Sequence, residues 1–215
     1  MSKPRFNPYN DNGGTVAAVA TGSRVVIAGD TRLSNGYNIL SRTYNKVTQL
    51  TSTSFIATSG MVTDAQNLHK HLMARIVLYK HQHGSEPSIR ALAKLLSVTL
   101  YSRRFFPYYT FNLICGLDEN GKGLVFGYDA IGSFDELGYG AQGSGQELMM
   151  SILDNQMKGE NRSDDNYSFS GDPIKLIKDV FNATAERDIH TGDHVLLWDV
   201  TPQGITQSTF KLRAD

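Results

Sequence analysis

The sequence predicts an α+β fold in which two β-sheets lie face to face and a layer of helices covers each outer side. Two observations carry this prediction. Blocks of short strands alternate with pairs of helices along the 215 residues, and each predicted helix has a single apolar face. A helix with one apolar face must bury it against another element. The economical packing is therefore a four-layer αββα sandwich.

The predicted strands are short runs of apolar and β-branched residues bounded by polar turns. Two of them, within 12–20 and 24–32, flank the turn Thr21-Gly22-Ser23 and form a hairpin. Because both runs are almost uniformly apolar, we expect this hairpin to be buried on both faces. The other predicted strands are 37–40, 47–50, 54–59, 110–117, 123–129, 194–201 and 205–211.

Four helices are predicted from apolar residues at three- and four-residue spacing. Thr63 is expected to open the first with a capping box completed by Gln66, and Ser88 to cap the second. The third begins near Gly145. The fourth begins at Asp172-Pro173, the order of residues that a helix start prefers.

The domain organisation follows from the polar stretches between these elements. Residues 1–13 are polar and contain two prolines, so we expect an extended N-terminal arm without a core of its own, a propeptide remnant. Residues 14–215 are expected to form one domain. Within it, the acidic and polar stretch 158–171 is expected to be an exposed insertion.

Composition excludes several function classes. The formal net charge is zero, which argues against nucleic acid or an anionic membrane as the main partner. No apolar stretch is long enough to span a bilayer and no signal peptide is evident, so an intracellular protein is expected. The single cysteine, Cys115, lies in an apolar run and is expected to be a buried thiol. Histidine pairs such as His69 with His71 have no third ligand at a recognisable spacing, so no metal or cofactor is expected.

Three motifs near the start carry a resemblance to a known family. They are Gly13-Gly14-Thr15-Val16, Ala28-Gly29-Asp30-Thr31-Arg32 and Asn45-Lys46-Val47. They resemble the opening of a proteasome β subunit, which has the N-terminal-nucleophile hydrolase fold. Catalytic members of that family begin their mature chain with a threonine after a glycine, with an aspartate and a lysine at fixed distances. Both distances lead back to position 14, which is Gly14.

Two later motifs extend the resemblance, which covers 13–211. Ser144, between two glycines, and Asp188 with Thr191 match residues that support the family's active site. Thr191 stands where the family has serine, and Asp193 stands where it has glycine. The resemblance implies a set of vestigial active-site positions: Gly14, Asp30, Lys46, Ser144, Asp188 and Thr191.

Local readings compete with the family reading for the third helix. Ser144 followed by Glu147 is also a capping box, which is the favoured local role. The stretch 138–143 matches a dinucleotide-binding fingerprint formally. No strand ending in an acidic residue follows at the required distance, so nucleotide binding is not expected.

The missing side chain at position 14 decides the expected function. In the family a threonine hydroxyl attacks the peptide carbonyl, and Gly14 has none. Thr15 is the alternative nucleophile, but adjacent strand residues point to opposite faces, so it should face away from Lys46. We therefore expect a non-catalytic subunit. An active threonine hydrolase that uses Thr15 and a free-standing domain that kept only the fold remain the alternatives.

The resemblance also implies partners. It implies stacked seven-membered rings of alpha and beta subunits in the 20S proteasome, with neighbours of the beta-5 and beta-7 types, polypeptide substrates, and a location in cytoplasm and nucleus. It implies a role in ubiquitin- and proteasome-dependent protein degradation. Asp129, in the turn 128–133, would help to form the pocket wall of an adjacent chymotrypsin-like subunit. A solvated turn aspartate is the plainer alternative. The motifs at 6–9, 103–109 and 153–156 resemble one non-catalytic member in particular.

Overall fold

A computed structural model describes residues 7–158 and 169–213 and contains two five-stranded sheets. The strands are β1 (Thr15–Thr21), β2 (Arg24–Asp30), β3 (Leu33–Asn35), β4 (Asn38–Ser41), β5 (Val47–Gln49), β6 (Ser54–Gly60), β7 (Thr110–Leu117), β8 (Gly123–Tyr128), β9 (Phe134–Leu137), β10 (Tyr139–Gly143), β11 (His194–Thr201) and β12 (Gly204–Lys211). The helices are α1 (Val62–His83), α2 (Ile89–Tyr101), α3 (Gln146–Leu153), the π-helical turn η1 (Asp154–Lys158) and α4 (Pro173–Ala185).

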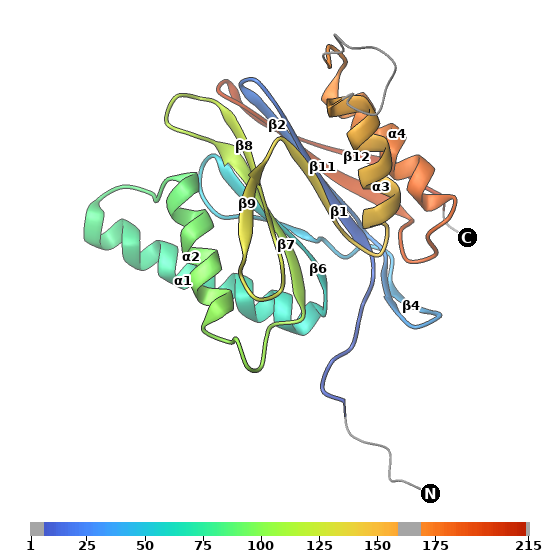
Figure 1. The fold of residues 1–215 in the computed structure, drawn as a ribbon, viewed down its shortest axis with the longest axis horizontal. Helices are drawn as coiled ribbons and strands as arrows, with labels where there is room; N and C mark the ends of the chain where they lie inside the picture. The colour runs from blue at the N-terminus through green and yellow to red at the C-terminus, as the bar shows by residue number, and fades with distance from the viewer. Residues whose placement is uncertain (1–6, 159–168, 214–215) are drawn as a thin grey trace, which may run out of the picture.

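The layers are the four that the sequence predicts. One antiparallel sheet has the strand order β10-β1-β2-β11-β12 and the other β5-β6-β7-β8-β9. Helices α1 and α2 cover the second sheet, and α3 and α4 cover the first (Figure 1). The strands β3 and β4 form a separate two-stranded hairpin. Most of the insertion expected at 158–171 lies outside the described residues.

The β1–β2 hairpin lies at the centre of the sandwich, and its predicted burial on both faces is confirmed. Val16, Ala18 and Ile27 point toward the opposite sheet, where they pack with its inner residues. Ala17 and Ala28 point the other way, into the core beneath α3 and α4. All five side chains are fully buried. The hairpin therefore holds its ends, including Gly14 and Asp30, in a rigid setting.

Of the four expected helix caps, those of α2 and α4 are confirmed, and those of α1 and α3 are wrong. Ser88 accepts a hydrogen bond from the Ala91 backbone N–H (3.3 Å), and Asp172 caps α4. Thr63, however, lies inside the first turn of α1, which begins at Val62 without any local side-chain cap. The Val62 N–H is instead bound by Asn12 Oδ1 (3.0 Å), a partner fifty residues away that a local pattern cannot reveal.

The strands β9 and β10 were not predicted, because their sequence lacks the β-branched residues that mark strands. The apparent dinucleotide fingerprint at 138–143 includes the whole of β10, which pairs with β1. Close backbone packing requires glycine at position 143. A Cβ on Gly143, whose φ is 112°, would lie 2.1 Å from the carbonyl oxygen of Gly14. Gly143 thus serves the pairing of β10 with β1.

His69 joins α1 to the sheet beneath it through two threonines. Its Nε2 lies 2.7 Å from Thr58 Oγ1, and its Nδ1 lies 3.1 Å from Thr48 Oγ1. Thr58 gives its own proton to Asn112 Oδ1 (2.8 Å), so it must accept one from His69 Nε2. His69 therefore carries a proton on Nε2, and both of its ring nitrogens have partners. Burial lowers the pKa of His69 to about 4.

This burial predicts a pH dependence of stability. An unfolded histidine has a pKa near 6.5, so the unfolded chain binds a proton between pH 6.5 and about 4 that the folded chain does not. The contribution is intact above pH 6.5 and is lost as the pH falls toward 4, by up to about 3 kcal/mol. Urea unfolding of the wild type and of His69→Gln between pH 4.5 and 7.5 measures it. The variant should lose less stability on acidification, whereas exposed His71→Gln should behave as the wild type. Equal slopes for all three would contradict the assignment.

Candidate functional site

Position 14 lies against the Asp30–Lys46 pair, so the structure brings these three predicted positions together. Gly14 has a φ of 80°, which favours glycine. A Cβ built on it would lie 2.3 Å from Lys46 Cε, 2.4 Å from Lys46 Nζ and 2.9 Å from Asp30 Oδ1. The end of the lysine side chain therefore occupies the space that any side chain at position 14 would need.

Asp30 and Lys46 form a buried and fully hydrogen-bonded ion pair. The Lys46 ammonium donates to Asp30 Oδ1 (2.9 Å), to the Asp30 carbonyl oxygen (2.9 Å) and to the Arg32 carbonyl oxygen, which uses its three protons. The Asp30 carboxylate also accepts from the backbone N–H groups of Thr15, Arg32 and Gly192. Burial raises the pKa of Asp30 and lowers the pKa of Lys46, while their mutual attraction opposes both shifts.

A second network links the other predicted positions. Ser144 Oγ and Thr191 Oγ1 each donate to Asp188 Oδ2 at 2.6 Å. Because Thr191 gives its proton to the carboxylate, the 2.7 Å contact between Thr15 and Thr191 must carry the Thr15 proton. The Thr15 hydroxyl in turn accepts from the Gly145 N–H at 2.8 Å. Thr15 is thus both a donor and an acceptor within this network.

Thr15 is the residue that the two networks share. Its backbone N–H binds Asp30, whereas its hydroxyl binds Thr191 and Gly145.

The expected capping role of Ser144 is wrong. Gly145 is the N-cap of α3 and makes no side-chain cap, and the Ser144 hydroxyl turns to Asp188. The reason is tertiary, because the start of α3 lies beside the end of α4, close to Asp188.

Asp193, which departs from the family motif, has a structural role of its own. It is the one non-glycine residue with positive φ (69°) in the described chain, a conformation that aspartate tolerates better than most residues. Its Oδ2 accepts from Arg32 Nε (2.9 Å), its Oδ1 binds Arg42, and it is 2% exposed. Burial alone would raise the pKa of Asp193, but the two arginines outweigh it and lower the pKa. Arg32 also donates to the Ile189 carbonyl (2.8 Å).

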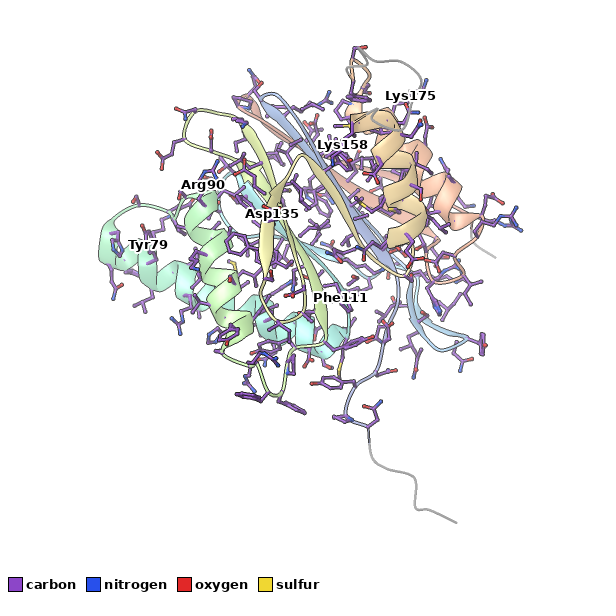
Figure 2. All side chains as sticks on the ribbon, viewed as in Figure 1. Tyr79, Arg90, Phe111, Asp135, Lys158 and Lys175 are labelled. Atoms are coloured by element: carbon purple, nitrogen blue, oxygen red, sulfur yellow. The ribbon has the colours of Figure 1, made fainter. Side chains whose placement is uncertain are left out.

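A small pocket of about 150 Å³ lies beside Gly14. Its lining is Asp11, Gly14, Gly60, Phe111, Gly143, Ser144 and Gln146. Phe111, labelled in Figure 2, stands at the start of β7 near the N-terminal segment.

Within residues 7–158 and 169–213, no group of three or more His, Cys, Asp or Glu side chains is placed to hold a metal ion. No helix in these two ranges has the length and apolar character needed to cross a membrane.

Asp129 lies apart from both networks, in the turn between β8 and β9. Its Oδ1 accepts from the backbone N–H groups of Ile131, Gly132 and Ser133 at 2.7–3.0 Å, so it stabilises its own turn. This is the arrangement that the plainer reading predicted. The side chain is exposed, and no hydrogen bond to Oδ2 is formed by the described residues. One oxygen is thus engaged and the other faces solvent.

Sequence reasoning missed three residues that hold this region together: Asn12, Thr15 as a network member, and Arg32 as the partner of Asp193. One sign of the contact between Arg32 and Asp193 was visible in the sequence, namely the aspartate at position 193 where the family motif has glycine. A buried acid needs a cation, but the two arginines lie 161 and 151 residues away along the chain. Nothing local singled out Asn12.

Arg32, Arg42 and Asp193 form an arginine clamp, and loss of its different members should lower the free energy of unfolding by unequal amounts. Asp193→Asn keeps the tolerance for positive φ but leaves the 3%-exposed Arg32 without a counter-charge, so it should destabilise the fold by about 3 kcal/mol or more. Arg42→Gln removes a half-exposed partner and should cost about 1 kcal/mol or less. Urea unfolding of both variants compares them. Equal costs would show that Arg32 does not depend on Asp193.

Comparison with known proteins places this site in a family. Residues 10–200 match the family model described as a proteasome subunit. The chain is 46% identical to proteasome subunit beta type-1 of Arabidopsis thaliana over the full length of both chains. It is 44% identical to the Dictyostelium discoideum protein of that name, over all of this chain and 93% of the relative. It is 34% identical, over the full length of both, to a Schizosaccharomyces pombe protein named probable proteasome subunit beta type-6. The chain with Gly14 beside the Asp30–Lys46 pair therefore belongs to the proteasome subunit family.

Proposed function

We propose that this chain is a non-catalytic β subunit of the 20S proteasome core particle. It builds the β ring and takes part in ubiquitin- and proteasome-dependent protein degradation. The observation that carries the proposal is the glycine at position 14, together with the Lys46 side chain in the space next to it. A threonine protease needs a hydroxyl at that point, and the supporting charges have nothing to activate.

The alternative nucleophile, Thr15, is disfavoured by its hydrogen bonds. A nucleophilic hydroxyl must present a lone pair to the substrate and its proton to a base. The Thr15 hydroxyl gives its proton to Thr191, accepts from the Gly145 N–H and is fully buried. Attack by Thr15 would require β1 to shift by one residue, which would move every buried side chain of that strand to the wrong face.

The surface supports a subunit over a free-standing domain. Large apolar side chains are more than half exposed on the outer side of α1 and α2: Val77, Leu78, Val98 and Tyr101. A groove of about 370 Å³ between these helices includes Leu78 and Val98 in its lining. Such a surface is typical of a protein that is covered by neighbours. We propose alpha and beta subunits as those neighbours, with beta-5 and beta-7 types adjacent in the ring, polypeptide substrates in the chamber, and a location in cytoplasm and nucleus. Native mass of the purified chain and particle tests the assembly.

Restoring the hydroxyl should not restore catalysis. Gly14→Thr places a β-branched residue at positive φ and drives its Cβ into Lys46, while the retained arm denies it a free amine. We expect no covalent labelling of the variant by a peptide epoxyketone and no new peptidase activity in the assembled particle. We also expect a lower stability than in Gly22→Thr, where φ is 58° but no atom lies within 4 Å of the added Cβ. Labelling of Gly14→Thr would show that the site is competent.

The proposed contribution to catalysis is indirect and rests on Asp129. In the proposed ring, the turn that contains it faces the substrate pocket of the adjacent chymotrypsin-like subunit. The free Oδ2 can accept a hydrogen bond from a bound peptide or inhibitor, while Oδ1 holds the turn in shape. A charge-assisted hydrogen bond shielded from water contributes about 1.5–3 kcal/mol.

Removing this carboxylate should weaken only the ligands that donate to it. Asp129→Ala should reduce the affinity of a ligand with a matching donor by about tenfold to a hundredfold in the neighbouring pocket. Asp129→Asn is the sharper variant, because its amide oxygen can still bind the turn while its NH₂ group cannot accept from the ligand. Inhibition profiles of all peptidase sites in the particle measure the effect.

Two controls separate this role from a change in the turn. A ligand that lacks the donor should bind both variants as tightly as the wild type. If Asp129→Ala alone weakens inhibition and Asp129→Asn does not, the aspartate acts only by holding its turn. Unchanged profiles for both variants would show that this side chain does not reach the pocket.

A further inference from the structure

The N-terminal segment before Gly14 is built into the fold by Asn12. The Asn12 backbone N–H donates to the carbonyl oxygen of Gly60 at the end of β6 (3.2 Å). Its carbonyl oxygen accepts from the Ser34 N–H in β3 (3.0 Å). The strands β3 and β6 do not pair with each other. The Asn12 backbone bonds to both, in the way that a residue of an added strand would.

The Asn12 side chain makes two more bonds in the same place. Its Nδ2 donates to the Ser34 carbonyl oxygen (3.1 Å), and its Oδ1 accepts from the Val62 N–H (3.0 Å). Val62 is the first residue of α1, whose local sequence offers no side-chain cap. The first N–H groups of a helix need acceptors from outside it. Asn12, only 7% exposed, supplies one of them from a distant segment.

The segment is fixed on both sides of Asn12. Upstream, the Tyr9 hydroxyl donates to the Pro107 carbonyl oxygen (2.8 Å), and its ring stacks on Phe106 at 5.6 Å. Downstream, Gly13 and Gly14 have φ values of 62° and 80° and turn the chain into β1. The segment therefore runs from the loop after α2 to the pocket beside Gly14.

We propose that the hydrogen bonds of Asn12 hold residues 7–13 permanently beside the pocket at Gly14 and at the same time cap α1. We call this set of bonds the latch. Two consequences follow. The Gly60 carbonyl and the Ser34 N–H are occupied by this chain, so a second peptide cannot pair with them. Trimming the chain as far as residue 11 leaves the latch in place, whereas removal through residue 13 strips the cap from α1. The latch rests on the proposed non-catalytic role in one respect, because processing to a free amine at residue 14 or 15 would remove Asn12.

Three variants of the full-length chain test the latch. Asn12→Ala removes both side-chain bonds. Asn12→Asp keeps an acceptor for the Val62 N–H but loses the donor to the Ser34 carbonyl. Asn10→Ala is the matched control, because Asn10 is an exposed asparagine in the same segment. Hydrogen exchange of the Val62 amide measures whether α1 is capped. The rate of limited proteolysis within 7–13 measures how firmly the segment is held, and thermal unfolding measures stability.

The variants should separate in a defined pattern. Asn12→Ala should speed Val62 exchange at least about fivefold, speed cleavage of the segment about tenfold or more, and lower the melting temperature by roughly 3–8 °C. Asn12→Asp should keep the Val62 protection but raise cleavage, and Asn10→Ala should match the wild type. The proposal is overturned if Asn12→Ala matches the wild type, or if Asn10→Ala is equally harmful. If Asn12→Ala does not fold, unchanged cleavage of Asn12→Asp overturns it.

Discussion

The buried ion pair between Asp30 and Lys46 holds together segments that are distant in the sequence. Removing both charges from water is costly, and the attraction between them offsets that cost only when their other hydrogen bonds are made as well. Those bonds go to the start of β1 through Thr15 and to the loop before β11 through Gly192. The geometry around Gly14 therefore depends on this pair, whether or not any chemistry takes place there.

In the proposed non-catalytic subunit, the residues around Gly14 have structural roles. Lys46 fills the place of the missing side chain, and the Thr15 hydroxyl is a closed member of the Asp188 network. Asp193 adds a clamp with Arg32 that a glycine could not make. Each of these features satisfies a buried polar group, and none leaves a nucleophile exposed. The proposed loss of catalysis would leave these residues free to serve stability, because stability and function commonly conflict at active sites.

The fold was predictable from sequence where burial leaves a local pattern. The uniformly apolar hairpin and the three- and four-residue apolar spacing of the helices predicted the layers. The family resemblance implied that Gly14 lies together with Asp30 and Lys46. The errors arose where a distant segment replaced a local partner. Asn12 caps α1 in place of Thr63, and Ser144 turns to Asp188 because the start of α3 lies beside the end of α4. The glycine-rich β10 went unpredicted, since its strand pairing depends on close backbone contact.

The most direct test of the non-catalytic assignment is the intact mass and N-terminal sequence of this chain after the purified particle is treated with a peptide epoxyketone. The account predicts an N-terminus upstream of Asn12 and no adduct on this chain, while catalytic neighbours in the same sample take up the label. An N-terminus at Gly14 or Thr15, or an adduct on this chain, would contradict it.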